Sequence, residues 1–145
     1  MLKFEHDNGG KTTKGRSGNC GPRAVAIATG RPYKEVLKEL NEYQIRSTGG
    51  MERSCNSGTA LQTIHHYMMT KVRSWELFTE KDAGKTLYFT DVPNDRMVLV
   101  VTSNHYCAVD HGTIRDLWDC QKSRRTKNGS RKILGYYRQA AAGTL

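Results

Sequence analysis

The chain has 145 residues, of which 37% are hydrophobic and 26% are charged, and its formal net charge at pH 7 is +9. This size and this balance predict one globular domain, residues 1–145, with a single core, and they exclude a disordered chain. The positive charge favours acidic partners, such as nucleic acid or an acidic protein surface, but it does not indicate any chemistry.

The sequence has no stretch that approaches the roughly 20 apolar residues of a bilayer span. Its first residues, MLKFEHDNGGKTTKGR, lack the apolar centre of a signal peptide. We therefore expect a cytoplasmic protein that has no membrane partner. Its small size and high basicity are typical of a phage or bacterial accessory protein, whose location would then be the host cytoplasm.

The N-terminal part of the chain predicts a strand, a loop and a central helix. A strand is expected around residues 2–6, and a polar loop follows it, so that residues 1–19 form an N-terminal strand and loop. In SGNCGPRAVAIATG, residues 17–30, small apolar residues follow Pro22, and Gly30 is a natural stop. This helix is apolar almost all round, so we place it at the centre of the domain.

The pattern then changes from helical to extended. Apolar residues at helical spacing predict amphipathic helices over residues 31–46 and 59–72. Short β-branched and aromatic runs separated by turn residues predict strands over residues 85–90, 97–102, 105–110, 113–118 and 133–138. N-terminal helices packed on a C-terminal antiparallel sheet form an α+β fold.

Residues 121–131 predict a basic exposed loop between the last two strands. The positive residues of this region are Lys122, Arg124, Arg125, Lys127, Arg131 and Lys132, and no acidic residue lies among them. This surface carries the alternative function, that of a basic non-catalytic protein that binds nucleic acid or an acidic host protein. Such charge runs usually form solvated surface, and no zinc-finger or helix-turn-helix motif accompanies this one.

The four cysteines, Cys20, Cys55, Cys107 and Cys120, contain no C-x-x-C pair. Free thiols are therefore expected, and neither a metal nor another cofactor is predicted. Cys107 lies two residues after His105 and would share its strand face. A third and a fourth metal ligand are not evident from the sequence.

Cys20 stands at the predicted start of the central helix. The unpaired N–H groups and the positive end of the helix dipole favour a thiolate there and lower the pKa of the thiol. Gly18 and Gly21 leave room for a substrate, and Asn19 with the Cys20 backbone N–H would receive an oxyanion. The simpler interpretation is a small buried residue that begins a core helix.

His105 opens a predicted strand, which a tight turn at DHG, residues 110–112, folds back into the strand that carries Asp116. Beside a thiol, the imidazole is the candidate base. A two-residue turn places Asp116 opposite His105 or one diagonal step away on the same face, where it would orient the ring. A three-residue loop with Gly112 in the left-handed conformation brings Asp119 to that face instead. The residues leave both registers open.

The motif SGNCGPRAVA, residues 17–26, is similar to the Asp-Gly-Asn-Cys-x-x-Arg-Ala block of ovarian-tumour-type deubiquitinases. NHY at residues 104–106 is similar to the His-Tyr that ends their active site. With its order of Cys, His and Asp, the chain resembles the papain-like cysteine peptidase superfamily over residues 15–46 and 97–120. It departs from the deubiquitinases at Ser17, where they usually have Asp.

The later motif HYCAVDHGTIRDLWD, residues 105–119, resembles bacteriocin-processing and phage-encoded papain-like peptidases. By that resemblance Asp116 is the third member of the active site. Those peptidases commonly carry a Gln six residues before the cysteine, and Lys14 stands there in this chain. Asn19 or the backbone alone would then stabilise the oxyanion.

The resemblance implies a papain-like α+β domain that hydrolyses an amide or isopeptide bond in a protein or peptide substrate. In such a domain Cys20, His105 and Asp116 would form a catalytic triad that works through an acyl-enzyme and needs no cofactor. An amine in place of water would make the same site a transferase.

Overall fold

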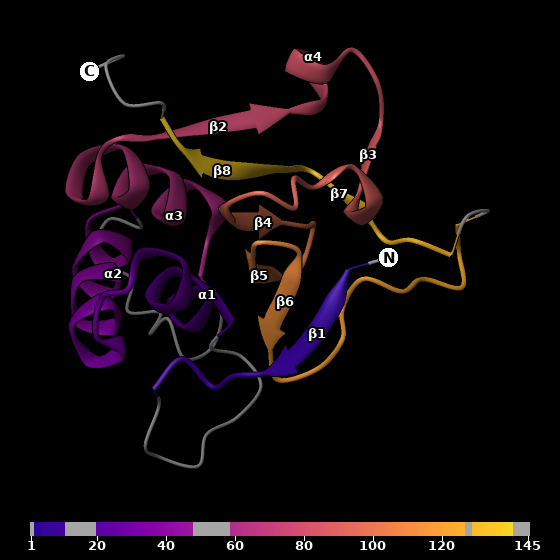
Figure 1. Cartoon of the computed structure of the whole chain (residues 1–145). Helices are drawn as coiled ribbons and strands as arrows, with labels where there is room; N and C mark the ends of the chain where they lie inside the picture. Colours follow the sequence, from indigo (N-terminus) through magenta and orange to yellow (C-terminus); the bar gives the residue numbers. More distant parts are fainter. Residues whose placement is uncertain (1, 11–19, 48–58, 127–128, 141–145) are drawn as a thin grey trace.

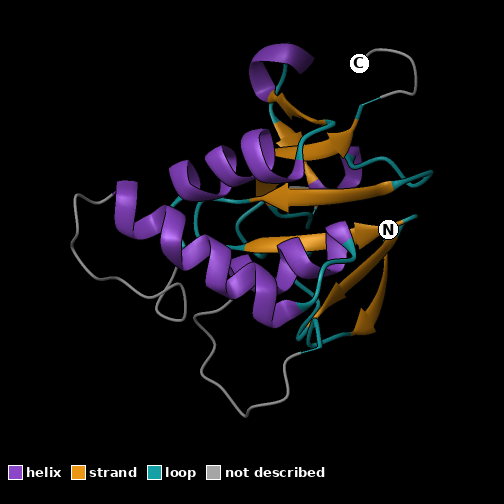
Figure 2. Ribbon diagram, turned by 90° about the vertical axis from the view of Figure 1, so that its left-hand side faces the viewer, coloured by secondary structure: helices purple, strands orange, loops and turns teal. Residues whose placement is uncertain are grey.

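The computed structural model describes residues 2–10, 20–47, 59–126 and 129–140 (Figure 1). In these ranges, helices and a six-stranded sheet form a mixed α+β structure. Figure 2 shows the longer helices gathered on one side of the sheet. None of the helices in the described ranges combines the length and apolar character that a membrane span requires.

The helix predicted to begin at Cys20 is present, and Pro22 lies in its first turn. Gly30 ends it with a φ of 73°, and the Gly30 N–H donates to the Ala26 carbonyl at 2.9 Å. The third predicted helix is divided, because its second half forms a π-helical turn. The helical elements are α1 (Cys20–Thr29), α2 (Tyr33–Ser47), α3 (Leu61–Tyr67), the π-helical η2 (Met68–Val72), α4 (Glu80–Ala83) and the 3-10 turn η3 (Phe89–Asp91).

The large sheet has the strand order β1-β6-β5-β4-β8-β2, and a small sheet pairs β3 with β7. The chain forms β4, β5, β6 and β8 where strands were predicted. The strands are β1 (Lys3–His6), β2 (Trp75–Thr79), β3 (Leu87–Tyr88), β4 (Met97–Val101), β5 (Tyr106–Asp110), β6 (Thr113–Asp116), β7 (Lys132–Ile133) and β8 (Gly135–Gln139).

One prediction about the sheet was wrong, and two elements were not predicted. The sheet is mixed rather than antiparallel, because the N-terminal strand β1 runs parallel to β6 and extends its edge. Residues 75–83 form the edge strand β2 and the short helix α4, neither of which was predicted. The side chains of β2 are half-buried or exposed, and its sequence is not a continuous apolar run like that of β4. The sequence pattern therefore did not indicate this strand.

Side chains of β4 and β5 alternate between two clusters of buried apolar residues on the two faces of the sheet. Leu99 and Ala108 face α1, whereas Val100 and Cys107 face the opposite side, where Phe89 covers the sheet. Helix α1 packs against β4, β5 and β6, and its buried side chains lie in the first cluster. This packing places the start of α1 close to the start of β5.

The basic segment 121–131 is only partly the exposed loop that was predicted. Gln121 and Ser130 are buried, and a β-bridge joins Lys122 to Ser130. The Arg131 backbone N–H donates to the Gln121 carbonyl at 2.6 Å, so the base of the segment is a closed hairpin. The segment therefore leaves the fold from a fixed base.

Gly135 in β8 has no room for a side chain. A Cβ on this residue would overlap the carbonyl oxygen of Phe78 in the neighbouring strand β2. We expect Gly135→Ala to lower the free energy of unfolding by about 1 to 3 kcal/mol, because the edge strand must move away. Thermal unfolding measures this effect. The matched control is Leu134→Ala at an exposed neighbour, and equal melting temperatures for the two variants would contradict the packing.

Candidate active site

Cys20 is the first residue of α1 and is 9% exposed. The His105 side chain and the Tyr106 backbone N–H at the start of β5 lie against its thiol, and both lower the pKa of the thiol. The sulfur therefore lies at a helix N-terminus and against an imidazole at the same time. The structure brings these two groups together although 85 positions separate Cys20 from His105 in the sequence.

The register of the β5–β6 hairpin decides which aspartate reaches His105. Asp110 pairs with Thr113, and between them His111 and Gly112 have φ values of 48° and 85°. This is a two-residue turn with two left-handed residues, so the three-residue alternative is wrong. Ala108 pairs with Arg115, so Asp116 falls one diagonal step from His105 on the same face.

The carboxylate of Asp116 is fully buried and hydrogen-bonded on both oxygens. Oδ2 lies 2.6 Å from His105 Nε2. Oδ1 accepts hydrogen bonds from Arg23 Nε at 3.2 Å, Arg23 Nη2 at 2.9 Å and the Leu117 backbone N–H at 2.7 Å. The carboxylate is thereby fixed in one orientation, with Oδ2 directed at the imidazole.

These contacts shift the pKa values of all three groups. Burial by itself would lower the pKa of His105, but hydrogen bonds to Asp116, Cys120 and Cys20 outweigh it and raise that pKa to about 11. Burial would raise the pKa of Cys20, yet the hydrogen bond and charge of His105 lower it overall. The pKa of Asp116 is also lowered, because its contacts with His105 and Arg23 outweigh burial. The geometry therefore favours a thiolate beside an imidazolium.

Trp118 covers the imidazole. The ring centroids of Trp118 and His105 are 4.9 Å apart. The guanidinium carbon of Arg131 lies over the Trp118 ring, 5.6 Å from its centroid. Arg131 Nε also donates to the Cys120 carbonyl at 2.9 Å. The base of the basic hairpin is thus tied to the His105 side of the site.

Cys120 is a second thiol next to His105 that the sequence did not single out. It is fully buried and lies against both His105 and Cys107. Cys107, which was weighed as a metal partner of His105, faces this second thiol instead, and burial and that contact raise its pKa.

Among the described residues, His105, Asp116 and Cys120 offer ligand atoms within 4.8 Å of one another, as a small metal site would. The arrangement fits a cation poorly. His105 Nε2 and Asp116 Oδ2 already bond to each other at 2.6 Å, and the Arg23 guanidinium holds the other carboxylate oxygen. A positive ion would have to separate the first pair and approach a fixed positive charge.

An apolar cavity of about 310 Å³ opens at the same end of the sheet as His105. Val101 contributes to its wall and pairs across the sheet with Tyr106, the residue after His105. Ile64 of α3 also contributes, and its side chain lies near Gly21, the residue after Cys20. Cys20, His105 and Asp116 are not among the residues that line this cavity.

Several predicted site residues do not join this cluster. Asn19, Cys55 and Lys127 lie outside the described residues. Asp119, the alternative orienting residue, accepts a hydrogen bond from Gln121 Nε2 at 3.0 Å instead. The remaining residues of the predicted basic loop that point to solvent are Lys122, Arg124, Arg125 and Lys132.

The sequence analysis did not select Arg23, Trp118 or Cys120 as site residues. For Arg23 a signal existed, since it lies three residues after Cys20, on the same turn of a helix that is otherwise apolar.

A scan against protein-family models and searches of curated proteins and of solved structures found no match to this chain.

Proposed function

We propose that this protein is a papain-like thiol hydrolase, a cysteine peptidase or isopeptidase that cleaves an amide bond. The observation that carries the proposal is that the Cys20 thiol lies against the His105 side chain, whose Nε2 is hydrogen-bonded to Asp116. A thiol at a helix N-terminus, a base in contact with it and a carboxylate that orients the base are the parts of nucleophilic catalysis.

In this proposal the Cys20 thiolate attacks the carbonyl carbon of the substrate, and negative charge develops on the carbonyl oxygen. The backbone N–H of Cys20 at the helix N-terminus is the oxyanion donor, together with Asn19. The His105 imidazolium then gives its proton to the leaving nitrogen as the C–N bond breaks. Asp116 keeps the Nε2 proton of His105 in place, so that the opposite ring nitrogen serves Cys20.

The acyl-enzyme that results is a thioester on Cys20. His105, now neutral, takes a proton from water, and the hydroxide attacks the thioester carbonyl and releases the acid and the thiolate. An amine that enters instead of water would form a new amide. The apolar cavity at this end of the sheet would suit a protein or peptide substrate with a large apolar side chain.

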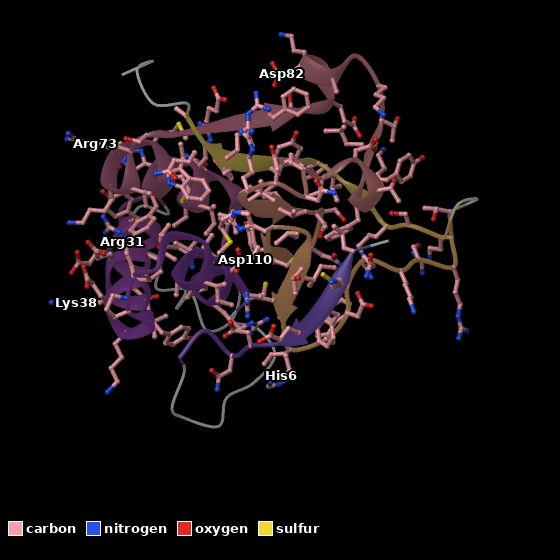
Figure 3. The ribbon with its side chains drawn as sticks, viewed as in Figure 1. His6, Arg31, Lys38, Arg73, Asp82 and Asp110 are labelled. Carbon is pink, nitrogen blue, oxygen red and sulfur yellow. The ribbon has the colours of Figure 1, made fainter. Side chains whose placement is uncertain are left out.

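The alternative, a basic protein that binds nucleic acid or an acidic protein, is favoured by the exposed Lys122, Arg124 and Arg125. The positive charge is not concentrated on that hairpin, however. Figure 3 shows Arg31, Lys38 and Arg73 at the helical side of the molecule. Binding that falls steeply with added salt and survives Cys20→Ala would support this alternative.

The pH dependence of Cys20 alkylation tests the hydrolase proposal. With a lowered pKa, Cys20 is expected to react with iodoacetamide near pH 6.5 faster than an ordinary thiol does, because a larger fraction of it is thiolate there. Mass spectrometry of the labelled chain gives the rate at each cysteine. A rate that rises only as pH passes about 8.5 would contradict the proposal.

Slow labelling of the other thiols is not sufficient support. Cys107 and Cys120 are 1% and 0% exposed, against 9% for Cys20, so both would react slowly whatever Cys20 does. The informative measurement is therefore the alkylation rate of Cys20 at a series of pH values. A second measurement compares cleavage of a peptide library by the wild type and by Cys20→Ser. Cleavage that persists in Cys20→Ser would rule out Cys20 as the nucleophile.

A further inference from the structure

Arg23 carries a positive charge into the interior of the molecule. Its side chain is 3% exposed, and the Asp116 carboxylate that it contacts is fully buried. The chain after β1 is shaped around it, because Gly9 has a φ of 71° and a Cβ there would lie 2.9 Å from Arg23 Cγ. A guanidinium does not lose its proton in proteins, so this charge is permanent.

The position of Arg23 links the helix that bears the nucleophile to the strand that bears the orienting carboxylate. Arg23 belongs to α1, three residues after Cys20, and both Nε and Nη2 reach Asp116 Oδ1 at the end of β6. Because these donors and the Leu117 N–H occupy Oδ1, Oδ2 is left to His105. The guanidinium thereby fixes how the carboxylate meets the ring.

We propose that Arg23 is a positioning residue of the active site: it orients Asp116 toward His105 and balances the charges of a buried cluster. The cluster consists of Cys20, His105, Asp116 and Arg23. With the thiolate and the carboxylate negative and the imidazolium and the guanidinium positive, its formal charges sum to zero. Without Arg23, two anions would share one imidazolium, and burial strongly disfavours that excess charge. Protonation of the thiol would be the simplest relief.

Other groups around the cluster define the conditions of the test. Cys120 contacts His105 from the segment after β6, and Cys107 contacts Cys120 from β5. Trp118 covers the ring. Arg115, the neighbour of Asp116 in β6, bonds to Asp110 at 2.9 Å and Glu5 at 3.1 Å and is 28% exposed. Arg115 therefore offers a matched control, because it forms an arginine–aspartate pair between β6 and β5 outside the cluster.

The inference rests on the proposed thiol chemistry and is tested by titrating Cys20 in three variants. The pH midpoint of Cys20 is followed by iodoacetamide alkylation and by the ultraviolet absorbance of the thiolate, with Cys20→Ser as the blank. Arg23→Met, which keeps the length but not the charge, is expected to raise the midpoint by about one unit or more. Arg23→Lys, which keeps the charge, should stay near wild type. Arg115→Met should leave the midpoint unchanged.

Equal midpoints in Arg23→Met and wild type would overturn the inference, and so would an equal rise in Arg115→Met. If Arg23→Met does not fold, the double variant Arg23→Met/Asp116→Asn removes both partners and leaves no unpaired buried charge. Its midpoint is then expected above that of Asp116→Asn alone, and equal values would contradict the inference. A wild-type midpoint that is itself unshifted would instead refute the proposed hydrolase.

Discussion

Replacing His105 by alanine is expected to lower the rate of Cys20 alkylation near pH 6.5 by about tenfold or more. The imidazole is the group whose hydrogen bond and charge lower the pKa of the thiol. Without it, burial remains and opposes ionisation, so the fraction of Cys20 that is thiolate near pH 6.5 falls by about tenfold for each unit by which the pKa rises. Amide cleavage should fall further, by about two to four orders of magnitude, because the proton donor to the leaving group is lost as well.

His66→Ala is the matched control for this experiment. His66 is exposed on α3, and its ring lies against Tyr43 rather than in the cluster. Stopped-flow alkylation and peptide cleavage of both variants, at matched folding by circular dichroism, give the comparison. If His105→Ala reacts like the wild type, no imidazole activates Cys20, and the hydrolase proposal is wrong.

Replacing Asp116 by alanine is expected to reduce the free energy of unfolding by about 3 to 5 kcal/mol. The change leaves the buried Arg23 guanidinium without its carboxylate and removes the partner of His105 Nε2. Asp116→Asn keeps the shape of the side chain and is expected to cost less. Denaturant unfolding at neutral pH measures both variants. A loss below about 1 kcal/mol in Asp116→Ala would show that solvent replaces the carboxylate at Arg23.

The contribution of Asp116 and His105 to stability has a defined pH window. The lowered pKa of Asp116 means that its contribution is present above about pH 4 and is lost as pH falls through the folded value. The pKa of His105 is raised to about 11, so its contribution is complete below about pH 6.5 and declines as pH rises toward that value. The difference in stability between wild type and Asp116→Asn is therefore expected to be largest between about pH 4 and 6.5.

The candidate site could be predicted from the sequence as far as local rules reach. The position of Cys20 at the start of α1 followed from Pro22 and the small apolar residues after it, since helix termini obey local preferences. For the hairpin, residues 110–112 indicated a tight turn and left two registers open. The paired left-handed conformations of His111 and Gly112 select the one that turns Asp116 toward His105.

Arg23 and Cys120 could not be assigned in this way, because their roles depend on contacts between distant elements. An arginine in an apolar helix is a local anomaly, and only the packing of α1 on the end of β6 gives it a carboxylate. Strand β2 escaped prediction for a related reason. Its half-buried residues show no clear strand pattern in the sequence. The segment is a strand because its backbone pairs with β8.

The sequence by itself determined the helix that carries the thiol, the strands β4, β5, β6 and β8 of the large sheet and the identity of the main residues of the candidate site. Periodicity and turn preferences act over a few residues, and these features need no more. The tertiary structure alone decided that β1 joins β6 in parallel, that Arg23 neutralises Asp116 and that Cys20 meets His105. Those outcomes depend on which buried surfaces fit together and on burial of charge, which no short stretch of residues encodes.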